Sequence, residues 1–209
     1  MPQAYVRRSA ADESPPHGDL LDRAHLADRE ELLERLHSGD SVAIQHEGEP
    51  ILGRAATPRR GGVMTAMSST MSMTADLLQL PDLRPGQRVL DVGTGAAVTA
   101  AVACFVCGDA GVVTLDIDPH VTAAAHEHLS ALGYRPVVRT GDGAAGWRRT
   151  GPYDRIFVSF AVPRVPRSPR PTGGRSGPGS RRRPTRRAAC GWRWTPCTLG
   201  WCGTSAPRT

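Results

Sequence analysis

The chain has 209 residues, which suits one globular core with appendages but not two full domains. It carries 26 basic and 20 acidic residues, a net charge of +6. Its longest apolar runs fall well short of the roughly 20 residues that cross a bilayer, and its N-terminus lacks the apolar stretch of a signal peptide. We therefore expect a cytoplasmic protein without a membrane partner.

The positive charge is concentrated at the C-terminus. From Arg164 onward there are 11 arginines and no acidic residue, so residues 1–163 hold 15 arginines against 20 acids, a net charge of −5. A mildly acidic body argues against a nucleic-acid partner, because binding to phosphates depends on a basic surface.

Residues 1–62 are predicted to form a variable N-terminal extension. Leucines among charged residues from Asp19 to His37 indicate one or two amphipathic helices. Ser41–Gln45 favours a short strand and Pro58–Gly62 a loop. The histidines of this region are scattered without the spacing of metal ligands, so no metal site is expected.

A glycine motif in the middle of the chain is its most informative feature. Val89–Val92 is predicted to be a buried strand, and Gly93 and Gly95 let the next turn approach a ligand where a Cβ would collide. An alanine-rich helix, Ala96–Val106, follows with its free N–H groups toward the ligand. A second strand ends at Asp116, about where a carboxylate accepts hydrogen bonds from ribose hydroxyls. These features predict an α/β, doubly wound sheet with a nucleotide-type cofactor site.

Two downstream segments resemble one methyltransferase family. The third glycine of a dinucleotide motif is absent, and the loop looks instead like the methyltransferase motif Gly-x-Gly-x-Gly with its last glycine replaced by Ala97. Residues 140–147, Thr-Gly-Asp-Gly-Ala-Ala-Gly-Trp, and the Pro-Tyr-Asp strand that follows at 152–154 are similar to segments of the protein-L-isoaspartate O-methyltransferase family. The similarity runs from about Thr65 to Pro166 and includes Leu-Arg-Pro-Gly-Gln-Arg-Val-Leu at 83–90.

The resemblance implies a Rossmann-like domain at residues 63–166 that binds S-adenosylmethionine and methylates a carboxylate of a protein or peptide. It assigns the methionine end of the cofactor to Gly93, Thr94 and Gly95, the ribose to Asp116, and the adenine amino edge to Asp142, with Gly143 allowing close approach. A carboxylate with a pKa of about 4 is already ionised at neutral pH, so no strong base is needed. Catalysis is then mostly alignment and desolvation of the two reactants.

Ser69 is the candidate catalytic residue. Counting back without gaps from Arg88, it falls where the family has the serine of a Ser-Gln-Pro segment, which is taken to hold the substrate carboxylate. Thr70-Met71 replaces Gln-Pro here. This departure leaves two substrates open: an isoaspartyl residue in a damaged protein, or an aspartate in a dedicated peptide. A structural interpretation makes these serines the N-cap of a helix that begins near Met73.

Other residues near the motif have structural interpretations. Asp91 either orients the glycine loop or serves a plain structural role at the end of its strand. Trp147 is expected to pack. Cys104 and Cys107 have the spacing of a redox or zinc pair, but they are expected to be small buried residues because they lie on an alanine-rich helix packed against a sheet. No second pair with histidines at ligand spacing supports a metal site.

Residues 167–209 are predicted to be a disordered tail rich in arginine, proline and glycine. Leu199 is its only aliphatic core-forming residue beyond alanine, so the tail cannot form buried strands. The whole chain lacks lysine and asparagine, which indicates GC-rich coding, and such DNA read out of frame yields this composition. We therefore favour a frameshifted tail over an arginine-rich nucleic-acid arm. The sheet is expected to lack its C-terminal strands, which leaves an impaired enzyme or an inactive cofactor-binding remnant as alternatives.

Overall fold

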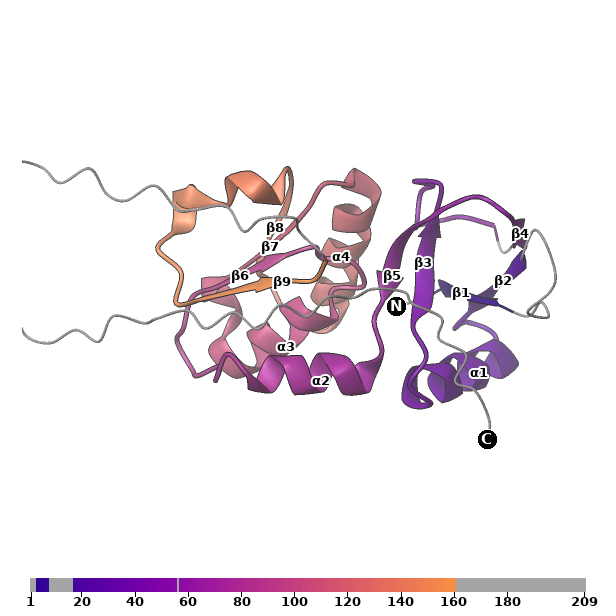
Figure 1. Ribbon diagram of the computed structural model, residues 1–209, viewed down its shortest axis with the longest axis horizontal. Helices are drawn as coiled ribbons and strands as arrows, with labels where there is room; N and C mark the ends of the chain where they lie inside the picture. The colour runs from indigo at the N-terminus through magenta and orange to yellow at the C-terminus, as the bar shows by residue number, and fades with distance from the viewer. Residues whose placement is uncertain (1–2, 8–16, 56, 161–209) are drawn as a thin grey trace, which may run out of the picture. The chain divides into compact units, whose positions relative to one another are not determined.

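The computed structural model describes residues 3–7, 17–55 and 57–160. Strands in these ranges form two sheets, one antiparallel and one parallel (Figure 1). The predicted tail, and with it the predicted loss of the closing strands, lies outside the described residues.

The parallel sheet has four strands in the order β8-β7-β6-β9 (Figure 1). Its strands are β6 (Val89–Val92), β7 (Val112–Asp116), β8 (Val137–Thr140) and β9 (Arg155–Val158). Strands β6, β7 and β8 lie next to one another in chain order, and β9 then pairs with the other edge of β6. This reversal confirms the predicted α/β, Rossmann-like doubly wound fold, and it creates a switch point at the carboxyl edge between β6 and β9.

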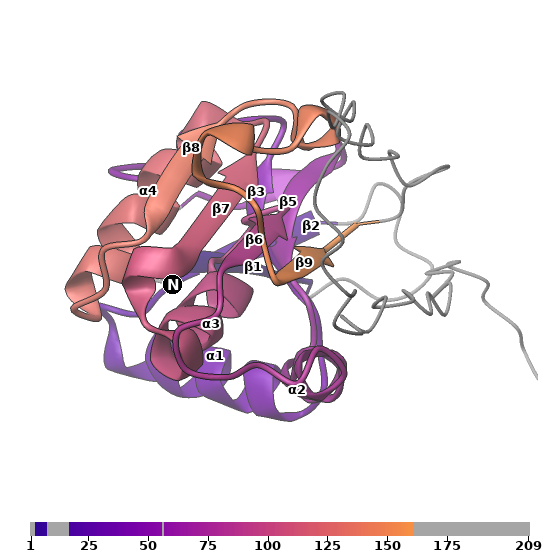
Figure 2. The same cartoon turned by 90° about the vertical axis from the view of Figure 1, so that its left-hand side faces the viewer.

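Two helices cover one face of this sheet, α3 (Val98–Cys107) and α4 (Pro119–Ala131) (Figure 2). Because side chains alternate along a strand, Val89 and Val112 face α3. Leu90 and Val113 point to the opposite face, where the connection from β8 to β9 covers them. That connection contains short 3₁₀ turns, η2 (Gly143–Ala145) and η3 (Arg148–Thr150), and contributes Trp147, which packs as predicted. A third such turn, η1 (Asp109–Gly111), joins α3 to β7.

The two cysteines of α3 are buried, as predicted. Cys104 and Cys107 are free thiols that pack with Val89 and Val112. Burial raises the pKa of Cys104 to about 12 and also raises that of Cys107. A thiol that stays protonated at neutral pH is a poor nucleophile and metal ligand, so these residues serve packing.

The antiparallel sheet has five strands in the order β4-β2-β1-β3-β5. They are β1 (Gln3–Arg7), β2 (His17–Asp22), β3 (Val42–His46), β4 (Arg59–Arg60) and β5 (Met64–Ser68). Since β5 pairs with β3, this sheet extends past residue 62. The strand predicted at 41–45 is confirmed as β3, shifted by one residue.

The predicted helical character of Asp19–His37 is only half correct. α1 spans Leu26–His37, but the first part of the segment is β2. Leu20 and Leu21 are both buried and pair with Tyr5 and Ala4 of β1, which the sequence did not reveal as a strand. Pairing with a distant strand thus overrides the helical spacing of the leucines. The predicted loop at 58–62 likewise contains β4, which pairs with β2.

The helix predicted near Met73 is α2, which spans Met71–Gln79. Its N-cap is Thr70, whose hydroxyl accepts a hydrogen bond from the N–H of Met73 at 3.3 Å. The cap is therefore the threonine that follows the serines, in the usual arrangement between an N-cap side chain and the third helical amide.

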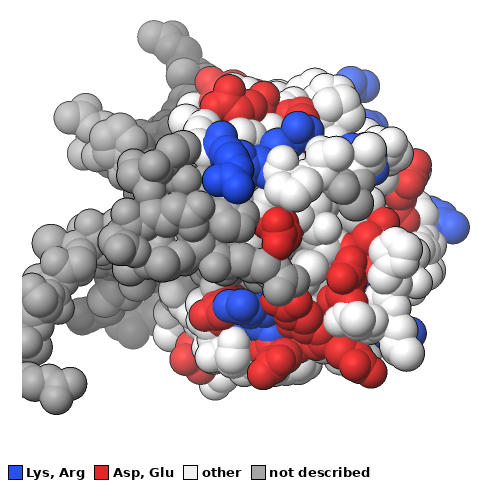
Figure 3. Space-filling view, turned by 90° about the vertical axis from the view of Figure 1, so that its right-hand side faces the viewer, with Lys and Arg blue, Asp and Glu red and all other residues white. Residues whose placement is uncertain are grey.

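Charged side chains of both signs share the face shown in Figure 3, with acidic groups predominating on its lower part. In the N-terminal region, acidic residues of α1 and of the turn after it line a shallow depression that includes Glu30, Glu31, Glu34 and Asp40. None of the helices in the described ranges has the length and apolar character that crossing a membrane requires.

Candidate functional site

The glycine loop after β6 needs glycine at two positions. Gly93 has φ +93°, and a Cβ there would lie 2.8 Å from the ring of Phe160. Gly95 has φ +47°, and a Cβ there would lie 3.1 Å from the carbonyl oxygen of Met67. Both residues adopt the left-handed region that favours glycine, and both sit against neighbouring backbone or side chains. Glycine at both positions therefore lets the loop pack against Phe160 and the end of β5 at the switch point of the sheet.

Hydrogen bonds from β7 hold this loop in shape. The N–H groups of Gly93 and Thr94 donate to the carbonyl of Leu115 at 2.8 and 3.1 Å, and the N–H of Gly95 donates to Asp116 Oδ2 at 3.1 Å. These three amides are engaged within the protein, so the loop is organised before a ligand arrives.

Asp116 ends β7 beside the glycine loop. Its Oδ2 accepts from Gly95, and its Oδ1 accepts from the N–H of Asp118 at 3.2 Å. Two backbone amides thus fix the orientation of the carboxylate. Each carboxylate oxygen has a second lone pair, so the group retains the capacity to accept from a pair of hydroxyls on a ligand.

The loop after β8 meets the same edge of the sheet. The N–H of Gly141 donates to the carbonyl of Asp116 at 2.8 Å. A Cβ on Gly143 would lie 2.1 Å from Cγ1 of Val92, so this position tolerates no side chain unless the Val92 side chain moves. Asp142 is exposed, and its Oδ1 accepts from the N–H of Ala144 at 2.8 Å, which caps η2.

Ser69 lies just beyond β5, and the end of that strand approaches the glycine loop. The carbonyl of Met67 is the group that would meet a Cβ on Gly95. Ser69 itself is half-buried, whereas Ser68 is buried with its hydroxyl 3.5 Å from the Ser69 carbonyl. The segment that carries Ser69 is therefore anchored next to the loop predicted to hold the methyl donor.

A buried polar network that the sequence did not predict lies beneath the loop. Asp91 is fully buried, and its Oδ2 accepts from the hydroxyl of Thr114 at 2.7 Å. The hydroxyl of Thr114 is also 2.7 Å from that of Thr94. The Thr94 side chain thus points into the protein. Asp91 and Thr114 are direct cross-strand neighbours. The signal available in the sequence was one polar residue inside each of these two apolar strands.

The environment of Asp91 disfavours its charged form. Burial raises the pKa of the Asp91 carboxyl to about 7. Hydrogen bonding from Thr114 opposes this shift, the charge of Asp116 adds to it, and the Ser159 hydroxyl opposes it. Among the described residues, no group donates to Asp91 Oδ1. A buried carboxyl with one oxygen left without a donor is a costly group to ionise.

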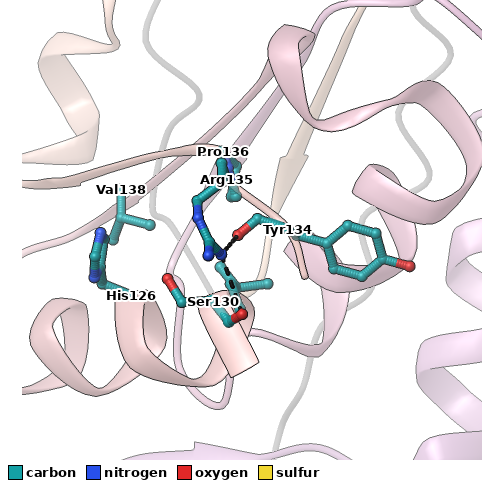
Figure 4. Close-up of a pocket in the computed structure, with 7 residues that line it drawn as sticks. His126, Ser130, Tyr134, Arg135, Pro136 and Val138 are labelled. Carbon is teal, nitrogen blue, oxygen red and sulfur yellow. Dashed lines mark hydrogen bonds between the residues drawn. The ribbon is translucent and has the colours of Figure 1, made fainter. Parts of the chain in front are cut away.

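A small cavity of about 160 Å³ lies away from these loops (Figure 4). Its lining comes from the C-terminal part of α4 and the segment leading into β8, and includes His126, Ser130 and Tyr134. Arg135 donates to the carbonyls of Ser130 and Tyr134 at 3.1 and 2.9 Å, so its guanidinium is committed to the helix end (Figure 4). The amino end of β8 is the opposite edge of a parallel sheet from the glycine loop. Among the described residues, no cluster of three or more His, Cys, Asp or Glu has a geometry suited to a metal ion.

Comparison with known proteins identifies relatives for the segment that contains these loops. The family model described as protein-L-isoaspartate(D-aspartate) O-methyltransferase matches residues 57–169, more than half of the chain. Protein-L-isoaspartate O-methyltransferase 1 of Archaeoglobus fulgidus is 42% identical over 101 residues, 47% of this chain and 47% of that protein. The enzyme of Gloeobacter violaceus is 34% identical over 125 residues, 59% of this chain and 55% of that protein.

A solved structure of a protein-L-isoaspartate O-methyltransferase is 35% identical, with a TM-score of 0.46, and the match covers 48% of this chain and 32% of that one. The chain spans about half the length of the relatives it matches in sequence.

Proposed function

Because this chain belongs to the protein-L-isoaspartate(D-aspartate) O-methyltransferase family, we propose that it transfers a methyl group from S-adenosylmethionine to the α-carboxylate of an isoaspartyl residue, which starts repair through a succinimide. The observation that carries the proposal is the convergence of three loops at the carboxyl edge of the parallel sheet. The glycine loop, Asp116 and the Asp142–Gly143 turn are tied together by hydrogen bonds and by close contacts.

The chemistry of these residues suits the cofactor. A Cβ at Gly93, Gly95 or Gly143 would meet Phe160, the Met67 carbonyl or Val92, so glycine lets these loops pack closely where the cofactor is proposed to bind. Gly93, Thr94 and Gly95 would contact the methionine end. The fixed carboxylate of Asp116 would accept from the two ribose hydroxyls, and exposed Asp142 would accept from the adenine amino group.

The bound cofactor supplies a methyl group made electrophilic by its sulfonium. The protein then needs to hold an ionised carboxylate in line with that methyl group and to exclude water. In this proposal the hydroxyl of Ser69 donates to the substrate carboxylate. No side chain has to remove a proton, because a carboxylate is already ionised at neutral pH.

A second substrate follows from the segment around Ser69. Thr70-Met71 stands where the family carries Gln-Pro, and Thr70 caps α2. α2 begins at Met71, so the replaced residues are the cap and the first residue of the helix that follows Ser69. This feature favours methylation of an aspartate in a dedicated peptide as the alternative.

Binding of S-adenosylhomocysteine tests the cofactor assignment. Isothermal titration calorimetry should show binding to the wild type, and Asp116→Ala should weaken it by about 1–3 kcal/mol through loss of charge-assisted hydrogen bonds. Glu127→Ala, which removes an exposed carboxylate from the second half of α4, should keep wild-type affinity. Equal affinities of wild type and Asp116→Ala would contradict the role of Asp116.

Labelled-methyl transfer distinguishes the substrates. Turnover of an isoaspartyl peptide but not of its aspartyl counterpart supports repair, whereas turnover of the aspartyl peptide alone supports the dedicated-peptide alternative. Cofactor binding without turnover of either peptide would identify an inactive cofactor-binding remnant.

A further inference from the structure

Gln45 is a fully buried polar residue of β3, outside the segment matched by the family model. The register between β3 and β5 shifts on both sides of it, since Ala43 pairs with Met67 but Gln45 pairs with Ala66. Such a bulge redirects the side chain of the strand that contains it. In this sheet, the bulge accompanies an amide side chain that is turned completely away from solvent.

The amide of Gln45 links the two sheets of the protein. Its Nε2 donates to the carbonyl of Glu49 at 3.0 Å and to Asp118 Oδ2 at 2.9 Å, and its Oε1 accepts from the hydroxyl of Thr65 at 2.7 Å. Both Nε2 donors are therefore used. Glu49 and Thr65 belong to the antiparallel sheet and its connections, whereas Asp118 follows β7 of the parallel sheet.

Asp118 continues this connection to the candidate cofactor site. Its Oδ1 caps α4 by accepting from the N–H of His120 at 2.7 Å. Its own N–H donates to Asp116 Oδ1 at 3.2 Å, and Asp116 Oδ2 accepts from Gly95. A continuous series of hydrogen bonds thus runs from Gln45 through Asp118 and Asp116 to the glycine loop.

Apolar packing surrounds the same connection. Val121 and Ala124 of α4 belong to one buried cluster with residues of the antiparallel sheet, among them Val6 and Ile44. Ala96, which follows the glycine loop, packs against this cluster. Hydrogen bonds in such a water-poor interior are strengthened and leave few alternative orientations for their members.

We propose that Gln45 is a positioning residue for the cofactor site. It holds the Asp118 carboxylate in one rotamer, and through the Asp118 N–H it holds the Asp116 carboxylate in the orientation that accepts the ribose. The inference rests on the proposed function, because it assigns Asp116 to cofactor binding. In this proposal the N-terminal sheet, through Gln45, helps to orient the residue that binds the cofactor.

The test compares Gln45→Leu with Tyr5→Phe. Leucine has similar size and cannot hydrogen-bond. Tyr5 is a matched control because it is buried in the same sheet and its hydroxyl donates to the Glu49 side chain at 2.5 Å. The hydrogen bond to Asp118 comes from Gln45 and is not removed in Tyr5→Phe. Hydrogen exchange should accelerate at the amides of Asp118 and His120 in Gln45→Leu only. The affinity for S-adenosylhomocysteine should fall about three- to tenfold in Gln45→Leu and stay within about twofold in Tyr5→Phe.

The two readouts separate positioning from a purely structural role. A purely structural role for Gln45 would lower the melting temperature of Gln45→Leu without a selective loss of affinity, and that result overturns the proposal. Unchanged exchange at Asp118 in Gln45→Leu also overturns it, even if the affinity for S-adenosylhomocysteine falls. A wild type that binds no S-adenosylhomocysteine overturns the proposed function, and the cofactor role of Gln45 with it.

Should Gln45→Leu not fold, Asp118→Asn addresses the same contact from the other side. Asparagine caps helices about as well as aspartate, so α4 keeps its start. Its amide nitrogen would meet Gln45 Nε2 as a second donor in place of Oδ2. The same selective loss of affinity is expected, and wild-type affinity in this variant would overturn the proposal.

Discussion

Replacing Asp91 by asparagine should flatten the pH dependence of the free energy of unfolding. Burial raises the pKa of the Asp91 carboxyl from 3.8 to about 7 in the folded protein. In the unfolded chain the group ionises near its ordinary value, so the folded state binds more protons between those pH values. The contribution of Asp91 to stability is therefore unperturbed well below pH 4, falls as the pH rises from about 4 to about 7, and stays low above that.

The size of this effect follows from the shift. A raise of about three pKa units at 1.36 kcal/mol per unit corresponds to about 4 kcal/mol lost between pH 4 and pH 8. Asparagine retains an oxygen that can accept from Thr114 and carries no charge at any pH. The variant should therefore lack this loss, although its amide nitrogen also needs a partner in the interior.

Urea denaturation at a series of pH values from 4 to 8 measures the difference. Between these limits the wild type should lose about 4 kcal/mol more than Asp91→Asn does. Thr114→Val tests the cause, because loss of its hydrogen bond to the charged form should raise the pKa of Asp91 further and extend the loss to higher pH. Identical pH dependence in wild type and Asp91→Asn would refute the reasoning.

Three other substitutions test the site. Gly143→Ala should cost about 1–3 kcal/mol of stability in thermal denaturation and weaken S-adenosylhomocysteine binding in calorimetry, because its Cβ would overlap the Val92 side chain; unchanged values would show that the Val92 side chain moves aside at little cost. Ser69→Ala should lower labelled-methyl transfer with cofactor affinity unchanged. A loss of transfer confined to Ser72→Ala would instead assign that role to Ser72, which lies in the first turn of α2. Thr70→Ala should lower the free energy of unfolding in urea by about 1 kcal/mol, since it removes the N-cap of α2; no change would mean that the cap contributes nothing.

The parallel sheet was predictable because its signals are local. Strands buried on both faces appear as short apolar runs, and Val89–Val92 was predicted with the bounds that β6 has. Gly93 and Gly95 mark the turn directly after that strand. The helix after the turn starts at Val98, two residues later than predicted, because Ala97 adopts a left-handed conformation with φ +64° before the helix begins.

The N-terminal sheet was not predictable to the same degree because its strands depend on partners far away in sequence. The leucines around Asp19 have a spacing that suits a helix, yet Leu20 and Leu21 lie in a strand that pairs with β1. A charged, short strand such as Arg59–Arg60 has no apolar pattern at all. Its strand character arises only from the pairing with β2.

The candidate site shows the same division. Gly93, Gly95 and Asp116 lie at or just after strand ends, so the local pattern of strand, turn and helix was enough to select them. Asp142, Gly143 and Ser69 were selected through the family resemblance. The hydrogen bond between Gln45 and Asp118 joins residues 73 positions apart, and no local pattern indicates it. Thr94 shows the limit of motif reading, because its side chain serves the buried network with Thr114 while its assigned contact with the cofactor stays a prediction.

The tail gives a final prediction that depends on composition alone. Deletion of the residues after about Ser168 should leave the urea-derived free energy of unfolding unchanged, because Leu199 is the only aliphatic core-forming residue beyond alanine in that segment. β9 pairs with β6, and Ile156 and Phe160 are 41% and 50% exposed, so a family-like helix and strand pair added after β9 should bury apolar surface and raise both stability and activity. The comparison needs the full chain, the shortened chain and the chimaera, measured by denaturation and by labelled-methyl transfer. A cooperative transition that disappears when the tail is removed would show that residues 167–209 are an integral folded part and would overturn the frameshift interpretation.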